Sequence, residues 1–94
     1  MDEIVWTRRA LRNLDDIADY IARDDAEAAQ RIVRRIVERV AGLAFFPRIG
    51  REGRIAGTRE LVIAGTPYIV LYRITERVEV LRIRHGAQRW PEQV

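Results

Sequence analysis

The residues best able to do chemistry lie near the end of the chain, in the stretch "LRIRHGAQRWP" (81–91). His85 is the only histidine of the protein, and it stands where an apolar strand pattern meets Gly86. An imidazole acts as a general base only beside a nucleophile or water and an orienting partner. No carboxylate of the C-terminal half stands at a recognisable spacing from His85. The sequence therefore favours a structural role at a strand end, with target contact or catalysis as alternatives.

Arginine dominates the charge of this chain. All 17 basic residues are arginine, there is no lysine, and the formal net charge is +3. A guanidinium offers a planar fork that suits phosphate and carboxylate. Because side chains two apart on a strand share a face, Arg82 and Arg84 are expected to project together. They form either an anion-binding surface or an ordinary solvated one. The mild net charge is short of that of a dedicated nucleic-acid binder.

Other kinds of chemistry find little support. The chain has no cysteine, which excludes a thiol nucleophile and a cysteine-based zinc site, and we predict no metal and no cofactor. Asp15 and Asp16 are adjacent on a predicted helix and do not face each other. Asp24 and Asp25 are explained by capping at the start of the next helix. The glycines of 50–57 fit no phosphate-loop pattern and are typical of turns.

Length and composition predict one domain over residues 1–94. The 48% hydrophobic and 33% charged residues are typical of a globular protein. No apolar run approaches the roughly 20 residues of a membrane span, and "MDEIVW" does not resemble a secretory signal. We therefore expect a cytoplasmic protein without membrane contact.

Two helices are predicted in the first half, after a short strand at 3–7. Thr7 is placed to cap the first helix. Asp24 and Glu27 resemble a capping box for the second helix, which is expected to reach about Ala44 before Pro47 stops further helix. Their short connection predicts an antiparallel hairpin. The stripe of the first helix contains Leu11, Leu14, Ile17, Ala18, Ile21 and Ala22.

The second half has the period of strands, at 58–63, 68–74 and 78–84. Tight connections predict an antiparallel meander, and the loop 47–57 has room for a further short strand. Regular alternation puts Tyr68, Val70 and Tyr72 on one face of their strand. On the last strand, alternation puts Leu81, Ile83 and His85 on the face opposite Val78, Val80, Arg82 and Arg84. The expected fold is α+β: an N-terminal strand and an antiparallel helical hairpin packed on a small, mainly antiparallel sheet (β-α-α-β-β-β).

This order at this length resembles the ParE/RelE-type toxins of bacterial type II toxin–antitoxin systems. The stretches that carry the resemblance are "VWTRRALRNLDDIADYIA", "FPRIGREGRIAGTRELVI", "PYIVLYRI" and "VEVLRIRHGAQRWP". Together they cover nearly the whole chain, and the last one is typical of the ParE-like branch. The resemblance implies a toxin neutralised by a cognate ParD-like antitoxin, whose ribbon-helix-helix dimer binds operator DNA. Operator DNA is then reached only through the antitoxin.

The family implies two different activities. RelE-like members cleave mRNA in the ribosomal A site without metal, and ParE-like members poison DNA gyrase. In the RNA-cleaving relatives three positions of the sheet carry basic residues, and an ungapped alignment puts Glu60, Val62 and Ile69 there. The late catalytic arginine of those relatives falls on Gln88. One acidic and two aliphatic side chains at these positions cannot bind a scissile phosphate. Their presence favours a gyrase poison that acts by binding.

Two alternatives stay open: a ribosome-dependent endonuclease and an inactive relative kept as an antitoxin partner. Some RNA-cleaving members use Glu, Arg, His and a C-terminal Tyr, and His85 matches part of that set. The predicted residues fall into two sets. Target contacts are expected at Arg82, Arg84, His85, Arg89 and Trp90, and a nuclease would use Arg59, Arg73, Arg82 and His85.

Overall fold

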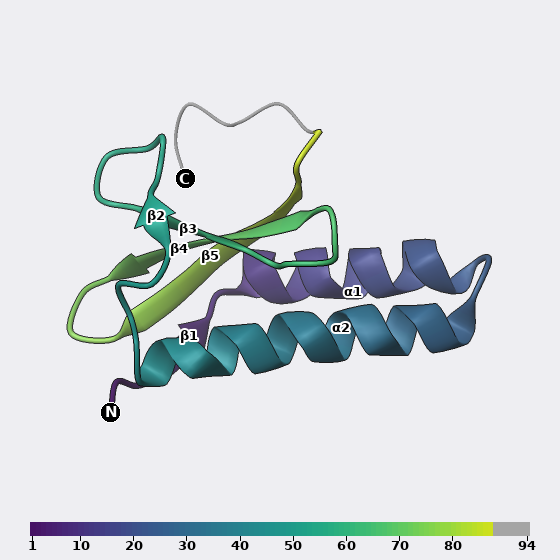
Figure 1. Cartoon of the computed structure of the whole chain (residues 1–94), viewed down its shortest axis with the longest axis horizontal. Coiled ribbons are helices and arrows are strands. Elements are labelled where there is room, and N and C mark those ends of the chain that lie inside the picture. The colour runs from purple at the N-terminus through teal and green to yellow at the C-terminus, as the bar shows by residue number, and fades with distance from the viewer. Residues whose placement is uncertain (88–94) are drawn as a thin grey trace.

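A computed structural model describes residues 1–87, in which a helical hairpin lies along one face of a five-stranded sheet (Figure 1). This arrangement confirms the predicted α+β fold, including a two-residue strand in the loop 47–57. The elements in chain order are β1 (Ile4–Trp6), α1 (Arg8–Ala22), α2 (Ala26–Ala41), the 3₁₀ turn η1 (Gly42–Ala44), β2 (Arg51–Glu52), β3 (Arg59–Val62), β4 (Tyr68–Ile74) and β5 (Val78–His85).

The strands lie in the order β1-β5-β4-β3-β2. β2 to β5 pair antiparallel with their neighbours, and β1 pairs parallel with β5. Short turns join the strands of the meander. The parallel partners β1 and β5, by contrast, are separated in the chain by the helical hairpin and the other strands. No helix among the described residues is long and apolar enough to cross a membrane.

Each helix of the hairpin begins after a residue whose side chain accepts a hydrogen bond from the first turn. The Thr7 hydroxyl accepts the Ala10 N–H at 3.2 Å, as predicted for α1. The predicted cap of α2 at Asp24 is wrong, because Asp25 holds that place and accepts the Ala28 N–H at 3.0 Å. The backbone N–H groups of both aspartates still bond the carbonyl of Ile21, so Asp24 belongs to the end of α1.

The hairpin buries a narrower stripe than the periodicity predicts. Ala10, Ile36, Val40 and Leu43 are buried against the sheet, whereas Leu11 is 47% exposed. α2 ends at Ala41, and the predicted extension to Ala44 is the 3₁₀ turn. The core on the sheet side consists of Leu61, Ile63, Tyr68, Val70, Tyr72, Val78, Val80 and Ile83.

A β-bulge in β5 changes the expected facing of its side chains. Leu71 pairs with Arg82 and Tyr72 pairs with Val80, so Leu81 is an extra residue between them. The regular alternation predicted along β5 is therefore wrong. Val78 and Val80 share the helix-covered face with Ile83 and His85, and they lie opposite Arg82 and Arg84. The helices cover the face of Tyr68, Val70 and Tyr72.

Candidate functional site

The face of the sheet turned away from the hairpin carries two cross-strand rows, and we call this the open face. One row runs from Arg51 through Glu60 and Leu71 to Arg82, and the other joins Val62, Ile69 and Arg84. The structure therefore places Arg82 and Arg84 on one face, as predicted. Arg82 is half-buried and Arg84 is buried. The pKa of each guanidinium is lowered, first by burial and then by a neighbouring arginine: Arg9 acts on Arg82, and Arg82 acts on Arg84.

Glu60 lies on the open face but is almost completely buried, at 2% exposed. Its carboxylate accepts hydrogen bonds from the Arg51 side chain and from the backbone N–H of Arg54, both at 3.0 Å. These contacts tie β2 and the start of the following loop to β3. Glu60 therefore compensates the charge of Arg51 rather than facing solvent.

Arg59 and Tyr72 hold the loop that precedes β2. The Tyr72 hydroxyl donates to the Pro47 carbonyl at 2.7 Å and accepts the Gly50 N–H at 2.9 Å. The Arg59 Nη1 donates to the carbonyls of Arg48 and Gly50 at 3.2 and 2.7 Å. Arg59 therefore holds the backbone of the loop at 48–50 through its carbonyls, a role that the sequence did not predict.

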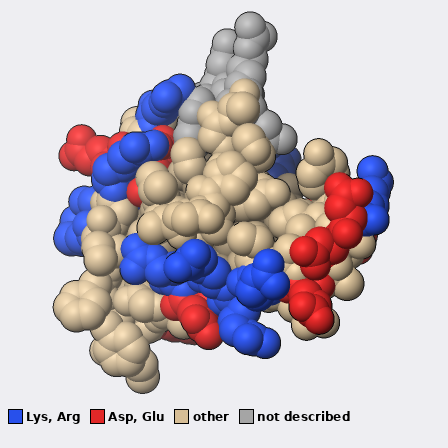
Figure 2. All heavy atoms as spheres, turned by 45° about the vertical axis from the view of Figure 1, so that its right-hand side comes forward, with Lys and Arg blue, Asp and Glu red and all other residues tan. Residues whose placement is uncertain are grey.

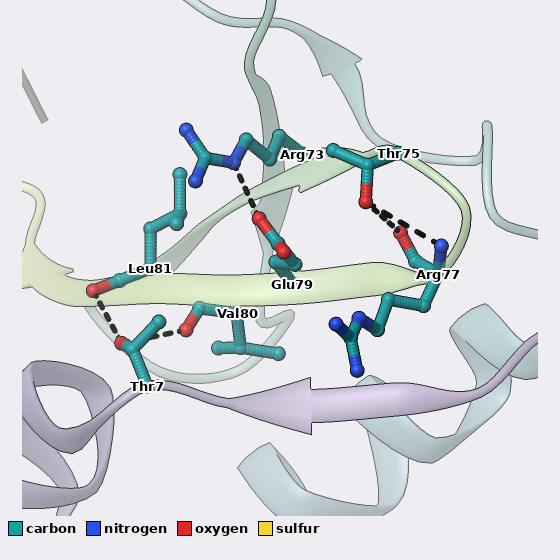
Figure 3. A network of polar contacts seen from close by, with 7 residues as sticks. All are labelled: Thr7, Arg73, Thr75, Arg77, Glu79, Val80 and Leu81. Atoms are coloured by element: carbon teal, nitrogen blue, oxygen red, sulfur yellow. Dashed lines mark hydrogen bonds and ion pairs between the residues drawn. The ribbon is translucent and has the colours of Figure 1, made fainter.

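Arg73 and Glu79 form an ion pair at the far end of the open face, with Nε to Oε1 at 2.5 Å (Figure 3). Nearby, the Thr7 hydroxyl lies within hydrogen-bond distance of the carbonyls of Val80 and Leu81, at 2.9 and 3.2 Å (Figure 3). Thr7 thereby joins the start of α1 to the bulge in β5.

His85 lies across the sheet from the arginines beside it. It pairs with Tyr68 on the helix-covered side, and the two rings meet edge to face with centroids 5.7 Å apart. The Ala87 N–H donates to its Nδ1 at 3.0 Å. Of the four residues expected in a nuclease, Arg73 and Arg82 project from the open face, while Arg59 and His85 share the side of Tyr72 and Tyr68. The structure does not bring these four residues together.

Hollows mark the surface of the described part of the chain, and three of them lie beside the helices or the loop before β3. A groove of about 740 Å³ between α1 and the sheet includes Asp16, Tyr20, Tyr68 and His85 in its lining. A hollow of about 500 Å³ lies over the loop 52–59. A third, of about 600 Å³, runs between the hairpin helices and is lined mostly by apolar side chains: Ala18, Ala22, Ala26, Ala29, Val33 and Val37.

Charged side chains of the same sign lie together on the surface. Figure 2 shows arginines in a band across the lower middle of one side of the molecule, with a separate group of acidic side chains beside them. Local fields can therefore be stronger than the net charge of +3 suggests. Within residues 1–87, no group of three His, Cys, Asp or Glu side chains is placed to hold a metal ion.

Sequence reasoning missed Arg9 and Asn13. The Asn13 Oδ1 accepts the Ile83 N–H at 3.0 Å and so caps the edge of β5 beyond the end of β1. A polar residue on the core-facing side of α1 is a usable indication of such a contact. Two of the predicted contact residues, Arg89 and Trp90, lie outside the described residues.

Tyr72 also makes stability depend on alkaline pH. Burial raises its pKa above 10.0, although the Gly50 N–H and the charge of Arg59 act in the opposite direction. Above pH 10 the unfolded chain releases the phenol proton while the folded chain keeps it, so the unfolded state binds fewer protons and stability falls. The contribution is complete below pH 10 and is lost as pH rises toward the folded-state pKa. Urea midpoints measured from pH 9 to 11 should fall more steeply for the wild type than for Tyr72→Phe, and equal slopes would contradict this assignment.

Comparison with known proteins gives consistent matches. Residues 4–90 match the family model of the ParE toxin of the type II toxin–antitoxin system parDE. A putative toxin, Y4kP, of Sinorhizobium fredii is 54% identical over 89 residues, which cover 95% of this chain and 93% of the relative. Toxin RelE2 of Caulobacter vibrioides is 40% identical over 89 residues, covering 94% and 99%.

Solved structures agree with the fold. A chain from the chromosomal ParDE system of P. aeruginosa superimposes with a TM-score of 0.81 at 31% identity, covering 90% of this chain and 96% of that one. The toxin–antitoxin complex RelBE2 of Mycobacterium tuberculosis gives a TM-score of 0.68 at 30% identity, covering 89% and 96%. With both sequence and fold matched over nearly the full length, the chain belongs to the ParE toxin family of type II toxin–antitoxin systems, within the ParE/RelE superfamily.

Proposed function

We propose that this toxin inhibits DNA gyrase and thereby blocks replication, acting by binding and without bond chemistry of its own. The observation that carries the proposal is the composition of the open face. The positions that are basic in RNA-cleaving relatives hold Glu60, Val62 and Ile69. Glu60 is buried in an ion pair with Arg51, and Val62 is the cross-strand neighbour of Ile69.

These substitutions remove the cations that phosphoryl transfer requires. A scissile phosphate needs positive groups aimed at its developing charge. Next to Arg84, the open face instead has an aliphatic pair, of which Val62 is 45% exposed. Such a surface can bind a partner but holds no phosphate in a cleavage geometry. We propose that Arg82, Arg84, His85, Arg89 and Trp90 contact the target.

The rival function is a ribosome-dependent mRNA endonuclease, which is metal-independent in the family. The relatives named RelE2 and RelBE2 favour it. Its expected residues, Arg59, Arg73, Arg82 and His85, are divided between the two faces of the sheet, and this arrangement supports the gyrase proposal over the nuclease.

The proposed partner is a cytoplasmic antitoxin of the ParD-like, ribbon-helix-helix type, which would also carry the complex to operator DNA. Two related structures come from toxin–antitoxin systems. The apolar groove between α1 and α2 suits an amphipathic segment, since Ala22, Ala26 and Val37 in its lining are exposed. An acidic polar side on that segment would match the net charge of +3.

Expression of the toxin without antitoxin tests the proposal in cells. We expect growth arrest with filamentation and induction of the DNA-damage response, because trapped gyrase leaves broken DNA. Immediate arrest of translation without DNA damage would instead support the endonuclease. Harmless overexpression of folded protein would support an inactive relative. Co-expression of the cognate antitoxin is the control and should restore growth.

A further inference from the structure

Exposed hydrophobic side chains gather at one corner of the molecule, where α2 ends and the chain begins (Figure 1). The Asp2 N–H donates to the Ala44 carbonyl at 2.9 Å, which brings the start of the chain next to the turn after α2. Four of the five most exposed large hydrophobic side chains in residues 1–87 lie there, and their exposed fractions run from 57% to 94%. We call this set the apolar corner: Met1, Phe45, Phe46 and Ile49.

Backbone hydrogen bonds fix the turn that presents these side chains. The N–H groups of Phe45 and Phe46 both donate to the Gly42 carbonyl at 3.1 Å, and the Ile49 N–H donates to the Phe46 carbonyl at 3.2 Å. The turn is therefore already ordered in the single chain. A surface of this kind loses less conformational freedom on binding than a loop that must first be ordered.

The size of the apolar corner is large enough to matter. Single hydrophobic side chains are common on protein surfaces, whereas a contiguous apolar patch marks a contact. A large side chain carries roughly 200 Å² of surface, so the four together expose roughly 500 Å². Two such patches placed face to face would bury roughly 1,000 Å², which is the size at which specific protein–protein interfaces begin.

The charges beside the apolar corner indicate which partner fits. Asp2 and Arg48 lie in the two segments that form it, and neither takes part in an ion pair within residues 1–87. A strongly acidic or strongly basic partner would meet a like charge at this surface. A second copy would not, because a two-fold axis presents the same patch to itself and sets the carboxylate of one copy against the guanidinium of the other.

We propose that the apolar corner is the contact between two copies of this chain, related by a two-fold axis. Its residues are distinct from those that line the groove between α1 and α2 and from the cross-strand rows of the open face. The proposed contacts with antitoxin and target therefore use other side chains. The dimer goes beyond the proposed function and does not depend on it.

Sedimentation equilibrium of the purified full-length toxin tests this contact. The wild type is expected to approach twice the monomer mass of 11.0 kDa as its concentration rises through the micromolar range. The double substitution Phe45→Ser/Phe46→Ser should weaken the dimer about 100-fold, because a few aromatic side chains carry most of the binding energy of an interface. Ile49→Arg should also separate the copies, since it adds a like charge to both sides of the contact.

Tyr20→Ser is the matched control, because Tyr20 is a 67% exposed aromatic residue of α1 near the opposite end of the hairpin (Figure 1). It should leave the dimer unchanged. Both phenylalanine rings are largely exposed, so their replacement spares the core, and thermal melting verifies folding. Ile49→Arg keeps the test decisive if the double variant does not fold.

Three results would overturn the proposal. A wild type that stays monomeric throughout the micromolar range would show that a second copy does not cover the apolar corner. A dimer weakened equally by Tyr20→Ser, or not weakened by the corner variants, would place the contact elsewhere. Species that grow beyond the dimer with rising concentration would replace the two-fold arrangement by a head-to-tail contact.

Discussion

Replacing Gly50 by alanine is expected to lower the free energy of unfolding by about 3 kcal/mol, since it overpacks a closed contact. A Cβ at this position would lie 2.5 Å from the Tyr72 hydroxyl oxygen and 2.9 Å from the Glu60 carbonyl oxygen. Tyr72 is fully buried and the second neighbour is backbone, so neither can move away cheaply. The added methyl also disturbs the hydrogen bond from the Gly50 N–H to Tyr72. Urea denaturation followed by circular dichroism measures the loss.

Gly42→Ala is the matched control for this substitution. Nothing lies within 4 Å of a Cβ built at Gly42, and its backbone is helical, at φ −62° and ψ −21°. We expect a gain of about 0.5 kcal/mol, because alanine restricts the unfolded chain. A Gly50→Ala protein as stable as the wild type would show that the loop at 47–50 does not pack on Tyr72 as described.

Tyr72→Phe is expected to lower the free energy of unfolding by about 2 kcal/mol, through unsatisfied buried groups. The substitution keeps the ring and removes one oxygen, which is both the acceptor for the buried Gly50 N–H and the donor to the Pro47 carbonyl. No other side chain of residues 1–87 accepts the Gly50 N–H, so the substitution leaves this donor without its partner.

Tyr68→Phe isolates the effect of the hydroxyl in a second tyrosine of the same strand. Tyr68 is buried, and its hydroxyl makes no hydrogen bond within residues 1–87. Its removal should change stability by less than about 0.5 kcal/mol, as for substitutions away from special contacts. Equal losses for the two phenylalanine variants would contradict the role assigned to the Tyr72 hydroxyl.

The hairpin and the meander could be predicted because their periods of 3.6 and 2 are carried by local runs of sequence. The bulge at Leu81 was missed because regular alternation was assumed across it. Its indication is present in the sequence: Val80 and Leu81 are adjacent apolar residues, and the apolar series shifts from 78 and 80 to 81 and 83. One extra residue reverses every later side chain. Reversal explains why Val80 and Arg82 face opposite sides despite their even spacing.

The candidate site was predictable only in part. Strand spacing sufficed to place Arg82 and Arg84 together. Arg9 could not be connected with them, because its position depends on how α1 packs along the edge of β5. Arg59 was expected in a nuclease site, yet its guanidinium binds the carbonyls of Arg48 and Gly50, which are 9 or more residues away in the chain. Contacts of that kind depend on loop conformation, which periodicity does not determine.

Incubation of the purified toxin with DNA gyrase, supercoiled plasmid and ATP is the most direct test of the central claim. The account predicts trapped linear plasmid after denaturation of the enzyme, or loss of supercoiling, and suppression of either effect by the antitoxin. Full supercoiling activity of gyrase in the presence of the toxin, together with cleavage of ribosome-bound mRNA at codons in the A site, would contradict it.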